Sequence, residues 1–365
     1  MTESEKHFNV FRENIIGIDH KVITPFGTKN LVYADWVASG RLYKIIEERM
    51  INEFAPFVGN THSETSFTGT LMTRSYHMAH SIIKAHCNAN GNDVIINAGF
   101  GMTAVVNKFQ RLLGLKVCEQ ISKYTSIPKE DRAIVFITHM EHHSNHTSWL
   151  ESTADVEVIL PNEQGLVDLD HFAVLLEKYK DRKLKIGSFT AASNVTGVQP
   201  DYHKMAKMIH EYGGYCFVDF AAAAPYVKIN MHPDNPLEKL DAIFFSPHKF
   251  LGGPGTSGVL IFDKILYNRS IPDHPGGGTV DWTNPWGQYK YVNDIEARED
   301  GGTPGFLQAI KTALSIQLKE EMGVENILKR EEELLSIALP ELKKIPKLHI
   351  LAHNIEHRLG IISFY

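Results

Sequence analysis

The sequence predicts an α/β fold in which a mainly parallel sheet of seven strands lies between two layers of helices. Short apolar runs recur along the chain, and amphipathic helical stretches separate most of them. Because these runs are apolar throughout, both faces of their strands should be covered. Strands that alternate with helices are typical of parallel sheets with helices on both sides. We therefore predict a three-layer α/β/α large domain.

The elements follow one another in a regular order. The predicted strands are 93–97, 133–138, 156–160, 185–190, 215–219, 242–246 and 258–262. Clear examples of the helices between them are 102–113, 168–179 and 201–212. Residues 273–305 break this pattern, because they are rich in Gly, Pro and Trp and show little periodicity. Loops of that length are usually functional or disordered.

The C-terminal part reads as two helices, 306–322 and 324–344, followed by two strands, 348–353 and 358–365. Two strands cannot bury their own faces. We expect a small α+β domain to begin near residue 325 and to be cut off at residue 365. The alternative is that these strands pack on the large domain and complete it. The expected division is an N-terminal arm and active-site loop (1–40), the large domain (41–324) and the start of the small domain (325–365).

Length and composition limit the function classes. With 365 residues, 43% of them hydrophobic, the chain can form one large domain and part of a second. A net charge of -6 and a pI of about 6.3 argue against the basic face that nucleic-acid binding needs. Three cysteines without a Cys-x-x-Cys pair fit a reducing cytoplasm. No signal region or membrane span is recognisable. We expect a cytoplasmic protein that binds neither nucleic acid nor membrane.

A lysine follows one of the predicted strands. In the run from Phe244 to Gly258, an apolar strand leads to Ser246, His248 and Lys249, and a Gly-rich stretch follows. A lysine at a strand end can act as a Schiff-base nucleophile if its pKa is lowered. The neighbouring Ser and His can donate to a phosphate. For an isolated lysine, a place in a surface loop is the simpler interpretation.

An aspartate ends the preceding strand. Asp219 closes the apolar strand that begins at Tyr215, and Lys249 lies 30 residues further on. Open α/β sheets place their ligand sites at such strand ends. A pyridoxal-5′-phosphate (PLP) cofactor needs a carboxylate at its pyridine nitrogen, which keeps the ring protonated. The alternative for Asp219 alone is a helix cap.

A histidine-rich segment, Thr138-His-Met-Glu-His-His-Ser-Asn145, follows another strand. A flat imidazole there could stack on a cofactor ring and move protons. The same segment offers possible metal ligands, namely His139, His142, His143 and His146. No cysteine or second carboxylate cluster accompanies them, so we favour the ring-stacking interpretation and expect no metal.

The run from Asn97 to Asn107 has the pattern of a strand, a Gly turn and a helix. Free N–H groups and the helix dipole make such a helix N-terminus an anion site. The third Gly of a dinucleotide fingerprint is missing, so the turn suits a single phosphate.

Together and in this order, the four segments resemble the class V aminotransferase family of fold-type I PLP-dependent enzymes. They are most similar to its cysteine desulfurase and selenocysteine lyase branch. The resemblance runs from about Tyr33 to the C-terminus and includes Gly302-Thr-Pro304. It implies a PLP-dependent transferase fold with a PLP-binding large domain and the start of a small C-terminal domain.

The resemblance also implies roles for individual residues. Lys249 would hold PLP as a Schiff base and move the α-proton of the substrate. Asp219 would pair with the pyridinium, and His142 would stack on the ring. The implied phosphate ligands are Gly101, Met102, Thr103, Ser246 and His248. Thr303 would reach the phosphate of the neighbouring subunit, which implies a homodimer.

Four further residues match family positions near the substrate: Ala38, Ser39, His62 and Asn194. Ala38 and Ser39 match the N-terminal loop over the site, and His62 matches a His at its entrance. Asn194 matches an Asn near the cofactor and the substrate carboxylate. The alternative for His62 and Asn194 is a role in a turn or in packing.

The chain departs from the family at several positions. Ala222 stands where many relatives have a Gln that contacts the phenolic oxygen of PLP, and Met102 stands where relatives often have Thr. The family's substrate-binding Arg and the desulfurases' persulfide-forming Cys are expected beyond Tyr365. None of Cys87, Cys118 and Cys216 matches that Cys.

We therefore expect a PLP-dependent enzyme, a transferase or lyase, that acts on a small amino acid. The leading hypothesis is a cysteine desulfurase or selenocysteine lyase. The alternatives are a class V aminotransferase or epimerase without sulfur chemistry, and a non-catalytic PLP-binding homologue.

Overall fold

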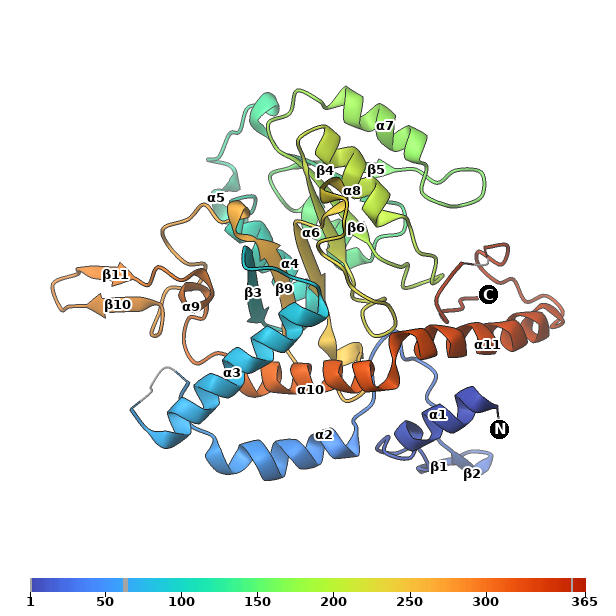
Figure 1. The fold of residues 1–365 in the computed structure, drawn as a ribbon. Coiled ribbons are helices and arrows are strands. Elements are labelled where there is room, and N and C mark those ends of the chain that lie inside the picture. The colour runs from blue at the N-terminus through green and yellow to red at the C-terminus, as the bar shows by residue number, and fades with distance from the viewer. Residues whose placement is uncertain (1, 62–64, 356) are drawn as a thin grey trace.

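A sheet of seven strands forms the centre of the computed structural model, which describes residues 2–61, 65–355 and 357–365 (Figure 1). Its strand order is β3-β9-β8-β7-β6-β4-β5. The strands are β3 (Asp93–Ala98), β4 (Ile134–Thr138), β5 (Asp155–Ile159), β6 (Lys185–Thr190), β7 (Tyr215–Asp219), β8 (Ala242–Phe245) and β9 (Gly258–Asp263). Strands β4 to β8 pair in parallel, whereas β9 pairs antiparallel with both β3 and β8. The predicted seven-stranded, mainly parallel sheet is confirmed.

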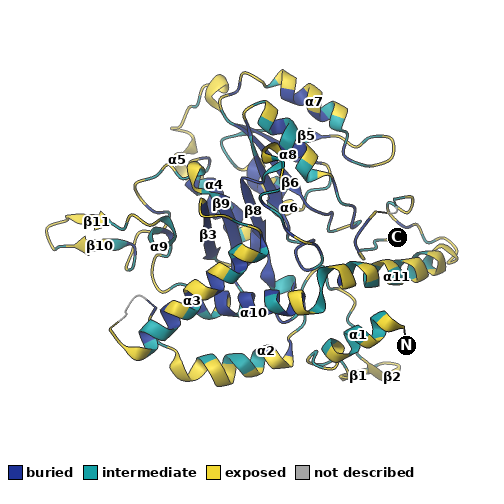
Figure 2. Cartoon of the chain, in the orientation of Figure 1, coloured by how far each residue is buried: buried dark blue, intermediate teal, exposed yellow. Residues whose placement is uncertain are grey.

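Helices cover both faces of the sheet. Successive side chains of each strand point to opposite faces, and both sets are apolar here, so each face needs a covering layer. On one face the apolar sides of four helices pack on the strands: α3 (Phe67–His86), α7 (Leu169–Lys178), α8 (Tyr202–Glu211) and α10 (Phe306–Met322). On the other face the two main helices are α4 (Gly101–Leu112) and α6 (His143–Leu150). Figure 2 shows buried strands and helices with exposed outer sides. The predicted three-layer architecture is confirmed.

Local capping sets several helix ends close to their predicted positions. Asp168 accepts the His171 N–H at the start of α7, and Asp201 accepts the Lys204 N–H at the start of α8. Such side-chain acceptors satisfy backbone donors that a helix leaves unpaired. The remaining helices are α1 (Glu3–Arg12), α2 (Lys44–Arg49), α5 (Glu119–Ser122), α9 (Ile295–Glu299) and α11 (Val324–Lys343).

The prediction of two C-terminal strands, 348–353 and 358–365, is wrong, because neither segment forms a regular strand. The described residues of 348–365 contain only isolated bridges, between Ile350 and Phe364 and between Val198 and Arg358. Lys347 and Ala352 have φ of 65° and 50°, and this conformation interrupts the extended backbone on both sides of Ile350. The last residues instead pack on the loop after β6, where Leu359 N donates to Gly197 O. The division of the chain at residue 325 stays a prediction.

The irregular segment 273–305 contains more structure than its sequence suggested. Strands β10 (Val280–Thr283) and β11 (Tyr289–Tyr291) form a hairpin that projects from the body of the molecule (Figure 1). A second hairpin, of β1 (Lys21–Thr24) and β2 (Gly27–Asn30), lies near the N-terminus.

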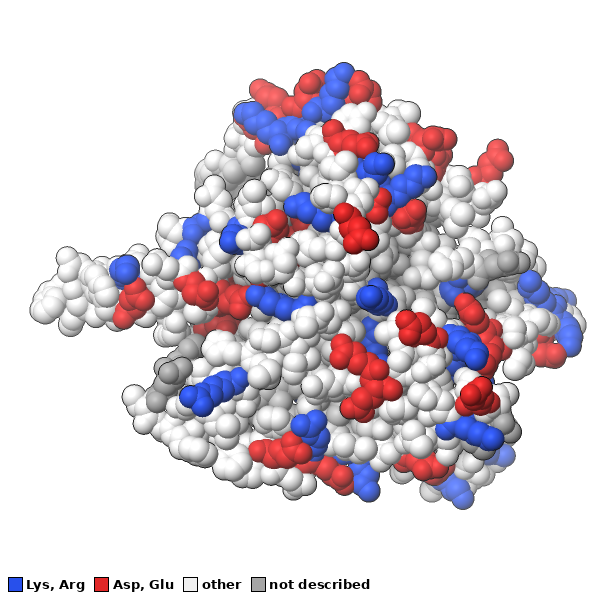
Figure 3. Space-filling model, in the orientation of Figure 1, with Lys and Arg blue, Asp and Glu red and all other residues white. Residues whose placement is uncertain are grey.

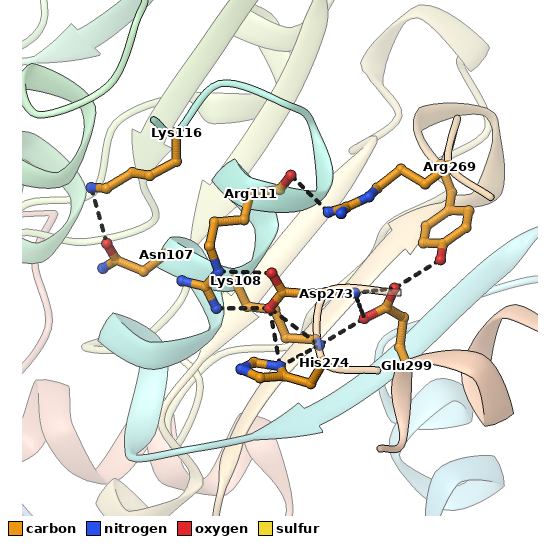
Figure 4. Close-up of polar contacts among 9 residues, drawn as sticks. Asn107, Lys108, Arg111, Lys116, Arg269, Asp273, His274 and Glu299 are labelled. Atoms are coloured by element: carbon orange, nitrogen blue, oxygen red, sulfur yellow. Dashed lines mark hydrogen bonds and ion pairs between the residues drawn. The ribbon is translucent and has the colours of Figure 1, made fainter. Parts of the chain in front are cut away.

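Buried ion pairs attach the 273–305 segment to α4 (Figure 4). The Lys108 ammonium lies 2.7 Å from Glu299, and the side chains of both residues are almost completely buried. Arg111 donates to both carboxylate oxygens of Asp273, at 2.8 Å each. The hydroxyl of Tyr267 also donates to Glu299. These ion pairs therefore fix the segment that carries the hairpin to α4.

Charges of both signs are interspersed over the molecular face drawn in Figure 3. Among the helices of the described residues, none combines the length and the apolar character that crossing a membrane requires.

Candidate active site

The carboxyl ends of the parallel strands meet at a cavity of about 430 Å³. This is where open α/β sheets bind their ligands. The lining includes ten of the residues that the sequence singled out: Ala38, Gly101, Met102, Thr103, His142, Asn194, Asp219, Ser246, His248 and Lys249. These residues come from segments far apart in the chain, and the fold brings them together at one edge of the sheet.

Asp219 and Lys249 line this cavity from neighbouring strand ends. Asp219 closes β7 and is 3% exposed, and its Oδ1 accepts the Ala221 N–H at 2.8 Å. Burial raises the pKa of Asp219 to about 6, against the opposing charge of Lys249. Burial lowers the pKa of Lys249, whereas the carboxylates of Asp219 and Asp35 act in the opposite direction. The site therefore favours a less basic amine at Lys249 than an exposed lysine would have.

His142 projects from the turn between β4 and α6. Its Nδ1 accepts the Ser144 N–H at 3.1 Å, so the ring serves as the N-cap of α6. Burial and the positive charges of Lys249 and His143 lower the pKa of His142. A neutral ring with Nδ1 as acceptor carries its proton on Nε2.

The N-terminus of α4 lies against the loop after β8. The Ser246 hydroxyl accepts the Met102 N–H at 2.8 Å. Gly101 has φ of +65°, and a Cβ there would lie 2.9 Å from Ser246 Oγ. Only glycine fits this close approach without strain. Thr103 Oγ1 lies 2.6 Å from Ser144 Oγ, and both residues line the cavity.

Alanines contribute part of the cavity lining. They are Ala192, Ala221 and Ala222, so the position where relatives carry Gln contributes no side-chain donor. Asn194 lines the same cavity and supplies an amide.

Some predicted residues lie elsewhere. Ser39 is not among the residues that line the cavity, but its hydroxyl donates to the carbonyl of His248 at 3.4 Å. Thr303 is exposed and does not line the cavity of its own chain. His62 falls outside the described residues.

Sequence reasoning missed other lining residues: Asp35, Val37, Phe100, Ser144, Thr190, Ala192 and Ala221. Thr190 is the last residue of β6, so the strand-end rule that selected Asp219 would have selected it too. Ser144 lies inside the His-rich segment. Asp35 lies in an irregular N-terminal loop and gave no sequence signal.

The residues present fit a PLP molecule. A buried carboxylate, a lysine of lowered pKa, an imidazole and a helix N-terminus opened by a glycine line one cavity. These groups match the ring nitrogen, the aldehyde, the ring face and the phosphate of PLP. In the described part of the chain, no three His, Cys, Asp or Glu side chains are grouped so that they could hold a metal ion.

The chain resembles known proteins over nearly its whole length. It is 27% identical over 339 residues to a probable cysteine desulfurase of Halalkalibacterium halodurans, covering 92% of this chain and 77% of that protein. It is 28% identical over 345 residues to a protein of the same description from Staphylococcus epidermidis, with the same coverage of each chain.

Two solved structures share its fold. An apo cysteine desulfurase from Thermococcus onnurineus superposes with a TM-score of 0.76 at 21% identity, covering 98% of this chain and 82% of that one. The Escherichia coli cysteine desulfurase CsdA gives a TM-score of 0.74 at 21% identity, covering 100% and 83%.

The sequence model of the class-V aminotransferases matches residues 32–365. The matched span includes each strand of the central sheet and every described residue that lines the cavity. The chain therefore belongs to the class-V aminotransferase family and is a PLP-dependent enzyme.

Proposed function

We propose that this enzyme acts on a small amino acid with chemistry of the cysteine desulfurase or selenocysteine lyase type. One observation carries the proposal: Lys249, Asp219, His142 and the N-terminus of α4 line a single cavity. The relatives described as probable cysteine desulfurases support the choice of reaction.

Lys249 and Asp219 line the same cavity and would hold opposite ends of the cofactor ring. The lowered pKa of Lys249 increases the fraction of neutral amine, which is the form that attacks an aldehyde and accepts a proton. Asp219 would place a negative charge at the ring nitrogen, whose positive charge would offset the cost of burying the carboxylate. PLP, once bound, supplies the electron sink for the electrons of the substrate's Cα–H bond.

The other cavity residues orient the cofactor and the substrate. His142 would cover one ring face, and its Nε2–H would be available to the substrate, because Nδ1 accepts the Ser144 N–H. Ser246, His248 and Thr103 would bind the phosphate at the N-terminus of α4, where the helix dipole favours an anion. Asn194 and Ala38, which line the cavity, would lie near the substrate carboxylate, and Ser39 would help to hold the loop over the site. The role that the family resemblance implies for His62 stays a prediction.

The cofactor assignment is tested by spectroscopy and chemical trapping. The purified protein should turn yellow with PLP, and borohydride should fix the cofactor on Lys249, as read by peptide mass spectrometry. K249A should stay colourless. Wild-type protein that remains colourless with excess PLP, or that is labelled on another lysine, would contradict the assignment.

The reaction is tested with L-cysteine. Sulfide and alanine as products support desulfuration, whereas a keto acid supports the class V aminotransferase alternative. Loss of optical purity without either product supports an epimerase. An amino-acid panel that leaves the cofactor spectrum unchanged would support a non-catalytic PLP-binding homologue.

We also propose a homodimer in which Thr303 completes the phosphate site of the partner. Thr303 is exposed and away from its own cavity, on a segment fixed to α4 by buried ion pairs. The hairpin on the same segment exposes Trp282, Trp286 and Tyr289, an apolar surface suited to a protein contact.

Mixed dimers test this arrangement. In a mixed dimer, one subunit carries K249A and the other carries T303V. The site that keeps Lys249 belongs to the T303V subunit and would receive Thr303 from the K249A subunit. Half of the sites should then bind PLP with wild-type affinity, whereas the T303V homodimer should bind it weakly. If Thr303 acted within its own chain, the mixed dimer would show only the weak affinity. A monomer in sedimentation analysis would contradict the proposal directly.

The three cysteines support a cytoplasmic location. All are unpaired, with Cys87 and Cys216 buried and Cys118 exposed. A reducing compartment keeps thiols in that state.

A further inference from the structure

Glu141 directly precedes His142 in the sequence, and the function proposed above assigns it no role. The residue as a whole is half-buried, but its carboxylate is enclosed by protein. An enclosed carboxylate is costly unless its oxygens are hydrogen-bonded. The partners of Glu141 therefore indicate why it is present.

One oxygen of Glu141 connects two strand ends. Its Oε1 accepts the Thr190 N–H at 2.9 Å, the Thr138 hydroxyl at 2.7 Å and the Thr138 N–H at 3.3 Å. Thr138 ends β4 and Thr190 ends β6. Thr190 lines the cavity and is paired in register with Asp219 on β7.

The other oxygen connects these strand ends to α6. Glu141 Oε2 accepts from Asn145 Nδ2 at 2.7 Å. Asn145 is fully buried, and its Oδ1 accepts from both Trp149 Nε1 and the Ser188 hydroxyl. These two donors fix the orientation of the Asn145 amide, so its N–H must face Glu141.

The surroundings of Glu141 therefore consist of donors only. A carboxylate accepts at both oxygens, whereas a glutamine would turn its own NH₂ toward a donor. Burial and the charge of Asp219 act against ionisation and raise the pKa of Glu141 to about 7, although its hydrogen bonds pull the other way. Asp219 on β7 is the ionisable neighbour whose charge acts on Glu141 directly. The charge of Lys249 acts to lower the pKa values of Asp219 and His142, and His143 also acts to lower the pKa of His142.

We propose that Glu141 is a positioning residue: its carboxylate ties the ends of β4 and β6 to the first turn of α6 and so fixes the His142 ring at the cofactor cavity. This inference rests on the proposed function, because it assumes that PLP binds against His142. It assigns Glu141 no contact with the cofactor or the substrate.

The test compares E141Q with wild-type protein and with E163Q, a matched control at an exposed loop position. The dissociation constant of PLP is measured by absorbance titration across the interval from about pH 6 to about pH 8, which brackets the pKa of Glu141. We expect E141Q to bind PLP about tenfold more weakly at the upper end, which corresponds to the loss of one charge-assisted hydrogen bond. E163Q should match wild-type protein throughout.

The pH dependence separates positioning from a merely structural role. Glu141 is ionised above its pKa and protonated below it, so the gap between E141Q and wild-type should be widest near pH 8 and should close toward pH 6. A structural defect would lower the melting temperature and weaken binding equally at every pH. Equal affinities at high pH, or a gap that does not change with pH, would overturn the inference.

Two further outcomes keep the test decisive. If E141Q does not fold, T138V is measured in its place, because it removes one donor to the same Glu141 oxygen. T138V should weaken PLP binding about threefold. Unchanged affinity in T138V would then overturn the inference. If wild-type protein does not hold PLP on Lys249, the proposed function itself fails. If wild-type protein holds PLP and the variants behave like it, only the role of Glu141 fails.

Discussion

Replacing Asp219 by Asn should change cofactor affinity and apo-protein stability in opposite directions. Asp219 is 3% exposed, and its Oδ1 accepts one backbone N–H that an Asn oxygen can also accept. In the proposed complex with PLP, the substitution would remove a buried charge-assisted hydrogen bond, which contributes about 1.5–3 kcal/mol. Since 1.4 kcal/mol corresponds to a factor of ten, we expect PLP to dissociate with a constant about 10- to 100-fold larger.

The apo protein should respond differently. Burial raises the pKa of Asp219 to about 6, so the ionised carboxylate costs the folded apo protein stability above that pH. The cost is absent below the unfolded pKa of about 4. Apo D219N should therefore be at least as stable as wild-type protein at neutral pH.

Both quantities are measured on the same preparations. PLP affinity comes from absorbance titration of apo protein, and stability comes from urea denaturation without cofactor. D170N serves as the control, because Asp170 is exposed on α7 and its substitution should leave PLP affinity unchanged. Its charge lies in the first turn of α7, so D170N should lower stability by less than about 1 kcal/mol. Wild-type affinity in D219N, or a large loss of apo stability, would refute the assignment of Asp219 as a cofactor ligand held at an energetic cost.

Two further predictions concern stability. E299Q should destabilise the protein by about 3 kcal/mol in urea denaturation, because it removes the carboxylate charge 2.7 Å from the buried Lys108 ammonium and leaves Asp273, at 3.6 Å, as the nearest counter-charge. D281N, which removes a 39% exposed carboxylate from a surface pair, should cost less than about 1 kcal/mol. Equal effects of the two substitutions would contradict this prediction. His210 donates from both ring nitrogens, to a backbone carbonyl and to Asp241, and its pKa is raised chiefly by that carboxylate against the effect of burial. The stability that this charge contributes is complete below the unfolded pKa of about 6.5 and is lost as pH rises through the folded pKa. H210Q should therefore be more destabilising in acid than in alkali. A difference in stability that does not change with pH would contradict this prediction.

The central sheet and the two main site residues were predictable because their signals are local. Apolar runs separated by amphipathic helices identified the strands of the sheet, and the polar residues at the strand ends identified Asp219 and Lys249. Parallel strands place their carboxyl ends at one edge, so strand direction alone was enough to bring these side chains near one another.

Other features escaped sequence reasoning because they depend on contacts between distant segments. Asp35 reaches the cavity from the irregular N-terminal loop, and no local pattern distinguishes it from a surface Asp. The residues after 347 have the apolar character of strands, yet backbone turns at Lys347 and Ala352 leave only isolated bridges. Glu141 belongs to the His-rich segment, but the sequence alone does not indicate its hydrogen bonds. Its donors come from three separate elements, β4, β6 and α6.

The sequence by itself determined the order of strands and helices in the region of the central sheet, the chemistry available at the strand ends and the cofactor that this chemistry suits. Periodicity and residue type act over a few neighbouring residues, and they can be read along the chain. The tertiary structure alone decided which side chains share the cavity, which carboxylates are buried and which way their pKa values move. Burial and electrostatic coupling arise only when segments distant in the chain pack together and exclude water.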